Sequence, residues 1–296
     1  MKVRLGYGLG TQAFATERFG ALVDGLERLG FDSLWLAERA TGGVPDPIVA
    51  LAVAAGRTRR LKLGTGVLVL PGRNPVLLAK ALASLDRLSD GRLLLAMGLG
   101  IAEPLEQQAF GVQREQRAAW FDEALPLIRR LWTEDAVDHA GPRFTLSGVC
   151  LGLKPQQQPL EVWLGGRAPS ELRRVGRLGD GWLASFCTPD EAASGKGLVE
   201  EAAAQAQREI DPEHFGVIVR YARGAIPASI ARQVAARRPG LRPEAIVPSG
   251  LDALCARVEQ FVRVGFSKFV LMPAEEPADW EAELEQVAEA VLPLVT

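Results

Sequence analysis

The stretch LGTGVLVLPGRNPVLLAKALASLDRLSDGRLLLAMGLG, residues 63–100, contains two predicted strands with a helix between them. The apolar runs Lys62–Leu68 and Leu93–Met97 are typical of strands buried on both faces of a sheet. Between them, Asn74–Leu88 carries apolar residues at helical spacing, and Gly91 follows as a stop signal. This order of elements predicts a unit of a parallel sheet.

The same alternation continues along the whole chain. Six further strands are predicted at Val3–Leu9, Ser33–Leu36, Glu161–Leu164, Gly181–Phe186, Phe215–Tyr221 and Lys268–Leu271. Seven further helices are predicted at Thr16–Leu29, Asp46–Arg57, Glu115–Trp132, Pro169–Leu178, Pro189–Glu209, Leu251–Val264 and Asp279–Leu292. This count indicates an α/β fold, a (β/α)8 TIM barrel, with a doubly wound open sheet as the alternative. Without a Pro/Gly/Ser linker, residues 1–296 are expected to form a single domain.

Two connections are too long to be plain loops. His139–Pro159 precedes the fifth predicted strand and is interpreted as a small hairpin or flap. Arg223–Gly250 follows the seventh strand and carries a basic helical piece. Long ordered insertions in a compact domain are usually lids or binding segments.

Composition excludes several classes of function. The formal net charge of -2 gives no general attraction for nucleic acid or an acidic membrane. The three cysteines are scattered without Cys-x-x-Cys spacing, so neither a disulfide framework nor a metal site is expected. The amino terminus lacks the apolar region of a signal peptide, and no apolar run reaches membrane-spanning length. A cytoplasmic protein with a small-molecule substrate is expected.

In a TIM barrel, functional residues lie at the carboxyl ends of the strands. The second predicted strand, in DSLWLAERA (residues 32–40), ends in Glu38 and Arg39. Charges at the end of a buried strand are either part of an active site or an ion pair at the rim. His214 begins the seventh strand, which predicts a place at the opposite face, and His139 lies in an insertion. Histidine chemistry is therefore not indicated.

Glycines follow several strands. Gly165, Gly166, Arg167 and Ser170 offer two backbone amides, a guanidinium and a hydroxyl at the start of a helix, which is a plausible phosphate cradle. The alternative is a tight turn in which Pro169 begins the helix.

Two long segments of the sequence resemble a known enzyme family. Leu63–Gly100 closely resembles the third and fourth βα units of the bacterial luciferase-like flavin-dependent oxidoreductases. PLEVWLGGRAPSELRRVGRLGDGW, Pro159–Trp182, resembles the fifth unit, with its Gly-Gly and its Gly-Asp-Gly-Trp. Within this superfamily, the sequence looks most like the actinobacterial branch associated with the deazaflavin coenzyme F-420.

The resemblance implies a (β/α)8 barrel with the ring of the cofactor lying across the strand ends. It implies a non-proline cis peptide at Gly66–Val67, whose bulge supports the back face of the ring. It also implies contacts to the phosphate and the ring from Gly98, Gly100, Gly165, Gly166, Arg167 and Ser185. Related barrels commonly pair, so a homodimer is expected.

Many deazaflavin relatives have an Asp-His pair where this chain has Glu38 and Arg39. Arginine stays protonated and is a poor general acid, but it can pair with an anionic substrate or a reduced ring. Glu38 is then either the proton carrier or the partner that orients Arg39, and an ordinary ion pair at the rim is the alternative.

Several other residues are expected to have structural rather than catalytic roles. Trp35 is interpreted as core, Arg73 as a clamp on its loop, and Cys187 as a small buried thiol. The basic run with Arg232, Arg237 and Arg238 either faces the acidic tail of F-420 or forms a solvated helix face.

The leading function is therefore an oxidoreductase that transfers a hydride between F-420 and an unidentified organic substrate. One alternative is a luciferase-type monooxygenase that uses flavin mononucleotide (FMN). The other is a flavin-binding barrel without catalytic activity.

Overall fold

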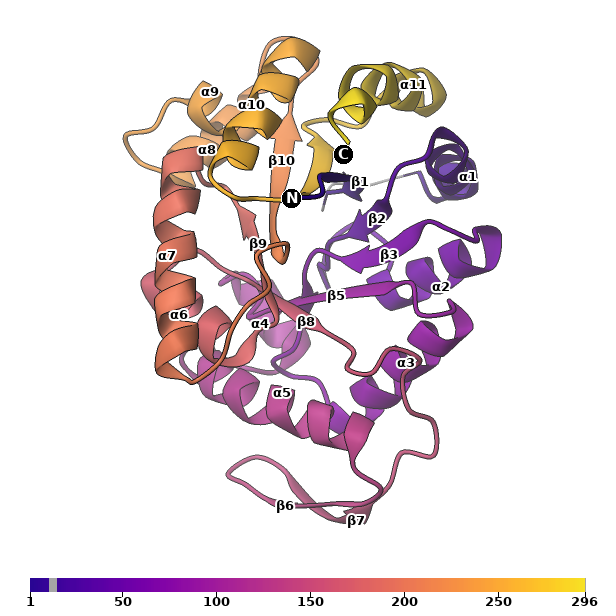
Figure 1. The fold of residues 1–296 in the computed structure, drawn as a ribbon, viewed down its shortest axis with the longest axis vertical. Helices are drawn as coiled ribbons and strands as arrows, with labels where there is room; N and C mark the ends of the chain where they lie inside the picture. The colour runs from indigo at the N-terminus through magenta and orange to yellow at the C-terminus, as the bar shows by residue number, and fades with distance from the viewer. Residues whose placement is uncertain (11–14, 296) are drawn as a thin grey trace.

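The computed structural model describes residues 1–10 and 15–295, and its strands form one parallel barrel surrounded by helices (Figure 1). The strands are β1 Arg4–Leu9, β2 Ser33–Leu36, β3 Lys62–Thr65, β4 Leu68–Val69, β5 Leu93–Gly98, β8 Val162–Gly165, β9 Gly181–Ser185, β10 Phe215–Tyr221 and β11 Lys268–Pro273. Pairing of β1 with both β2 and β11, and of β3 with β5, closes the ring. The predicted (β/α)8 barrel is confirmed.

Helices follow the strands and cover the outside of the barrel. They are α1 Phe19–Leu29, α2 Pro47–Arg57, α3 Pro75–Leu88, α4 Pro104–Phe110, α5 Arg117–Thr133, α6 Pro169–Leu178, α7 Pro189–Gln205, α10 Leu251–Arg263 and α11 Trp280–Val291. Asp46 and Asn74 begin α2 and α3, since each side chain accepts two backbone N–H groups of the first turn. A proline follows each of these caps, where its missing N–H has no cost.

Two elements differ from the prediction. The third strand, predicted as the continuous run Lys62–Leu68, divides into β3 and β4 around Gly66 and Val67. Helix α4 was not predicted, because its seven residues are too few to show a helical period.

A separate apolar cluster fills the inside of the barrel. Its buried members come from five different strands: Trp35, Ala96, Trp163, Leu183 and Val270. Trp35 is 2% exposed, so its interpretation as core is confirmed. Side chains of this kind close the barrel interior and leave its carboxyl end as the place for a ligand.

Both insertions are ordered, and they lie at opposite ends of the molecule in the view of Figure 1. The first forms the predicted hairpin from β6 Val137–Ala140 and β7 Thr145–Val149. The second contains α8 Ala228–Arg237 and α9 Pro243–Ile246. It has a small core of its own, made by Ala222, Ile230, Val234, Ile246, Val247 and Ala274.

Arg238 fixes the second insertion to the barrel. Its guanidinium donates to the carbonyl oxygen of Phe186 at 2.5 Å and pairs with the Glu191 carboxylate. Within the described part of the chain, no helix combines the length and the apolar character needed to cross a membrane.

Candidate functional site

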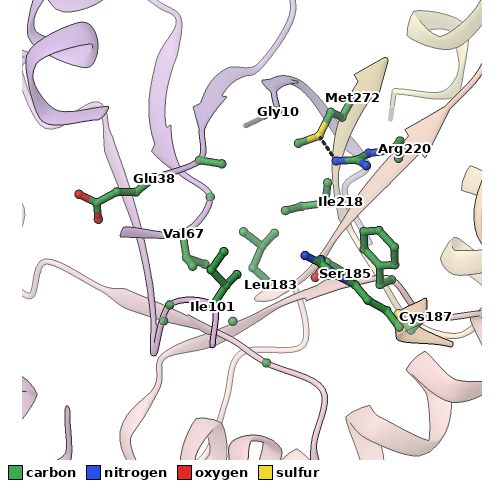
Figure 2. Close-up of a pocket in the computed structure, with 18 of the residues that line it drawn as sticks. Gly10, Glu38, Val67, Ile101, Leu183, Ser185, Cys187, Ile218, Arg220 and Met272 are labelled. Atoms are coloured by element: carbon green, nitrogen blue, oxygen red, sulfur yellow. Dashed lines mark hydrogen bonds between the residues drawn. The ribbon is translucent and has the colours of Figure 1, made fainter. Parts of the chain in front are cut away.

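A cavity of about 340 Å³ lies at the carboxyl ends of the strands (Figure 2). Nearly all the residues predicted from the sequence line it, namely Glu38, Arg39, Gly66, Val67, Gly98, Gly100, Gly165, Gly166 and Ser185. Arg167 and Ser170 of the expected phosphate cradle are the exceptions, because both side chains are exposed and neither is among the residues of the lining.

Val67 forms the floor of the cavity. The Gly66–Val67 peptide bond is cis, which confirms the prediction for this bond. Glycines frame the Val67 side chain: a Cβ on Gly98 would lie 2.7 Å from Val67 Cγ2, and one on Gly165 would lie 2.9 Å from Cγ1. Both distances are shorter than real contacts, so a side chain at either position would force the Val67 side chain to shift.

The start of α6 already holds an oxyanion, the carboxylate of Glu171. Its Oε2 accepts hydrogen bonds from the backbone amides of Arg167 at 2.8 Å and Ala168 at 2.9 Å. Glu171 also lines the cavity, next to Gly165 and Gly166. A carboxylate at this helix end shows that the amides favour an anionic group. Sequence reasoning missed this residue, although glutamate at the third helical position is a capping signal.

Glu38 is held in place at both of its carboxylate oxygens. One accepts the backbone N–H of Val69 at 2.6 Å, and the other pairs with Arg73. Arg73 Nε also donates to the Val69 carbonyl oxygen at 3.0 Å, which confirms Arg73 as a clamp on this loop. The Glu38 side chain is 5% exposed. Burial raises the pKa of Glu38, and the positive charge of Arg73 opposes that rise.

Arg39 has acidic partners of its own. Its guanidinium lies 2.7 Å from Glu103 Oε2 and 3.4 Å from Glu106 Oε1. Glu38 therefore does not orient Arg39 through an ion pair. Figure 2 shows the Glu38 carboxylate turned away from Leu183, which lies near the centre of the cavity.

Arg117 shapes another wall and was also missed by sequence reasoning. One guanidinium nitrogen, Nη1, donates to the carbonyl oxygens of Leu99, Gly100 and Ile101. This residue of α5 thus fixes the loop after β5, although its position inside a helix gave no functional signal.

The remaining candidates divide between the cavity and the surface. Arg237 lines the cavity, and Arg232 is exposed on α8. Arg238 fixes the second insertion to the barrel through Phe186 and Glu191. Cys187 lines the cavity as a buried thiol, and burial raises its pKa to about 12, which keeps it protonated. His214 precedes β10 and does not line the cavity, as predicted.

Comparison with known proteins places the chain in a family. A family model described as luciferase-like monooxygenase matches residues 1–291. An F-420-dependent glucose-6-phosphate dehydrogenase of Kineococcus radiotolerans is 33% identical over 206 residues, which are 66% of this chain and 58% of that protein. The chain therefore spans a little under three fifths of the length of this relative.

Two solved structures share the fold. An F-420-dependent secondary alcohol dehydrogenase in complex with an F-420–acetone adduct superposes with a TM-score of 0.85 at 19% identity, over 100% of both chains. The monooxygenase RslO1 from Streptomyces bottropensis superposes with a TM-score of 0.80 at 23% identity, over 99% of both chains. These similarities concern the barrel. Because the family model covers nearly the whole sequence, the chain belongs to the luciferase-like monooxygenase family.

Proposed function

We propose that this chain is an oxidoreductase that transfers a hydride between the deazaflavin coenzyme F-420 and an organic substrate. The observation that carries the proposal is the Val67 floor framed by Gly98 and Gly165, an apolar surface at the strand ends that suits a flat ring. The resemblance of the third to fifth βα units and the F-420-dependent relative support the coenzyme.

The residues present fit such a coenzyme. When bound, F-420 supplies or accepts the hydride at C5 of its ring. Val67 supports one face of the ring, and the backbone at Gly165 and Gly166, beside the start of α6, suits the phosphate. Apolar side chains such as Leu183 and Ile218 exclude water from the reacting face.

The catalytic role of Glu38 and Arg39 stays a prediction. Both line the cavity, and the raised pKa of Glu38 favours a group that can hold a proton. Their existing ion pairs support an additional role, which is to tie the loop after β2 to the loops after β4 and β5. The expected homodimer and a cytoplasmic location also stay predictions.

Purified protein is expected to bind reduced F-420 at least tenfold more tightly than reduced FMN. Quenching of the fluorescence of the two coenzymes in parallel titrations measures the preference. Tighter binding of FMN would favour the luciferase-type monooxygenase and contradict the proposal. If the protein binds F-420 but converts none of a panel of alcohols, ketones and enones, the result would favour the flavin-binding barrel without catalytic activity.

Gly98→Ala is expected to weaken F-420 binding by roughly tenfold, because the new Cβ displaces Val67 from the floor. The matched control is Gly152→Ala, since a Cβ there has no heavy atom within 4 Å. Titration of both variants against wild type, with circular dichroism melting to check the fold, makes the comparison. Equal affinities for all three proteins would remove Val67 from the coenzyme site.

A further inference from the structure

The β10 side of the cavity carries a guanidinium without an acidic partner. Arg220 lines the cavity, and the only hydrogen bonds of its side chain within the described residues go to Gln233 Oε1 at 2.7 Å and Met272 Sδ at 3.7 Å. Neither partner is charged. In Figure 2, Arg220 and Met272 lie across the cavity from Val67 and Ile101.

A second guanidinium lies close to the first. Arg237 of α8 lines the same cavity, and no ion pair is found for it among residues 1–10 and 15–295. Both guanidinium carbons approach the Phe186 ring, Arg220 at 5.6 Å and Arg237 at 5.3 Å from its centroid. The two positive charges therefore share one aromatic support. Burial, and then the charge of Arg237, lowers the pKa of Arg220.

The carboxylates that line the cavity bond to groups other than Arg220 and Arg237. Glu38 and Glu171 are the carboxylates of the described lining. Glu38 is held by Arg73 and a backbone amide, and Glu171 is held by two backbone amides. Partial burial of the Arg220 guanidinium without a counter-charge is unfavourable, and the exposed Arg237 adds a second positive charge beside it, so this side of the cavity suits an anion brought by a ligand.

The surroundings of the two arginines are apolar. Ile218, Met272, Leu183, Ile246 and Phe186 complete this side of the cavity. A sugar would need several hydrogen-bonding groups for its hydroxyls, and here Gln233 is already bonded to Arg220. A planar guanidinium fork is suited instead to a carboxylate or a phosphate.

We propose that Arg220 and Arg237 form a subsite for the oxyanion of an otherwise apolar substrate, a carboxylate or a phosphate ester with a hydrocarbon body. This inference rests on the proposed function, since it names the substrate class of the same cavity. The coenzyme phosphate is assigned to the start of α6, after β8, which leaves the β10 side for the substrate.

The test uses two probes of one shape that differ in charge, hexanoate and hexan-1-ol. Ligand-observed NMR titration measures the dissociation constant (Kd) of each for the full chain, with and without bound F-420. Arg220→Gln is expected to raise the Kd of hexanoate at least tenfold, because a charge-assisted hydrogen bond is lost. The Kd of hexan-1-ol is expected to change less than twofold.

Arg237→Gln provides a second test at an exposed position where folding is not at risk, and it is expected to raise the Kd of hexanoate severalfold. Arg232→Gln is the matched control, an exposed arginine of the same helix outside the cavity lining, and is expected to leave both probes unchanged. Unchanged hexanoate binding in both cavity variants would overturn the subsite.

A further experiment tests whether the oxyanion bound by the two arginines belongs to the substrate or to the coenzyme. Wild type and Arg220→Gln are titrated with F-420 and with its riboflavin-level core, which lacks the phosphate and the glutamates. Affinities within twofold of wild type are expected. A loss for F-420 alone would assign the arginines to the coenzyme tail, and a loss for both would assign them to the ring; either result overturns the proposal. If wild type binds neither F-420 nor FMN, the proposed function fails. The oxyanion subsite is then still tested by comparing hexanoate binding to wild type and to the two cavity variants without coenzyme.

Discussion

Glu38→Gln is expected to lower kcat/KM by about a hundredfold with the best substrate of the panel, the size of effect that loss of a proton carrier produces once its carboxylate turns from Arg73 and Val69 toward the cavity. Glutamine keeps the shape of the side chain but cannot carry the proton. It also loses the ion pair with Arg73 that helps to fix the loop containing Val69. Steady-state kinetics together with F-420 titration separates the two losses, because a proton carrier affects turnover without affecting coenzyme affinity.

Arg73→Met is the matched variant, because it removes the same ion pair and keeps the carboxyl group. Burial raises the pKa of Glu38 while Arg73 lowers it, so removal of Arg73 raises that pKa further. If Glu38 carries the proton, Arg73→Met stays active and its pH–rate profile moves to higher pH. Equal loss of activity in both variants, with weaker F-420 binding, would reduce Glu38 to a positioning residue.

The stability of Arg73→Met has a defined dependence on pH. A carboxyl whose folded pKa exceeds its unfolded value stabilises the fold below the unfolded pKa, and that contribution is lost as pH rises through the folded pKa. The free energy of unfolding of Arg73→Met is therefore expected to fall with rising pH above the ordinary range of glutamate, more steeply than that of wild type. Urea unfolding at several pH values measures the slope.

Asp180→Asn is expected to lower the free energy of unfolding by about 2 kcal/mol, between the effect of removing one partner from an exposed ion pair and from a buried one, because this ion-pair network is partly buried. The Asp180 carboxylate lies 2.5 Å from Arg129 and 2.9 Å from Arg208, and it accepts the Val162 amide at 2.9 Å. Burial already lowers the pKa of Arg129, so the substitution leaves a desolvated charge without its counter-ion.

Asp135→Asn is the control for this substitution, because Asp135 is exposed and no ion pair is found for it in the described residues. The melting temperature of Asp180→Asn is expected to fall by about 4 °C, at roughly 2 °C per kcal/mol for a chain of this length. A melting-temperature shift equal to that of Asp135→Asn would show that water replaces Asp180 as the partner of Arg129 and Arg208 at no cost in stability.

Local patterns were sufficient to predict the barrel and its floor. The apolar runs gave the strands because each is buried on both faces, and the Leu63–Gly100 resemblance gave the cis bond at Gly66–Val67. Asp180 shows why one motif is so distinct, since the Asp of Gly-Asp-Gly-Trp ties α5, β8 and the segment after α7 together.

Contacts between distant segments could not be predicted in the same way. Glu38 and Arg39 are neighbours in sequence, yet their partners Arg73, Glu103 and Glu106 lie 35 to 67 residues further on. Arg220 is a single charge inside an apolar strand run, and a strand pattern alone does not tell whether such a residue faces the cavity or the helices. Its partner Gln233 lies on α8, which folds back over the strand end.

The insertion after β10 brings Gln233, Arg237 and Ile246 to the cavity from one continuous piece of chain with its own small core. We expect such a piece to be exchangeable as one unit. Replacing it would then alter what the barrel acts on and leave the glycine-framed floor unchanged. Transplanting residues 222–250 between two members of the family is a direct route to redesigning what each enzyme accepts.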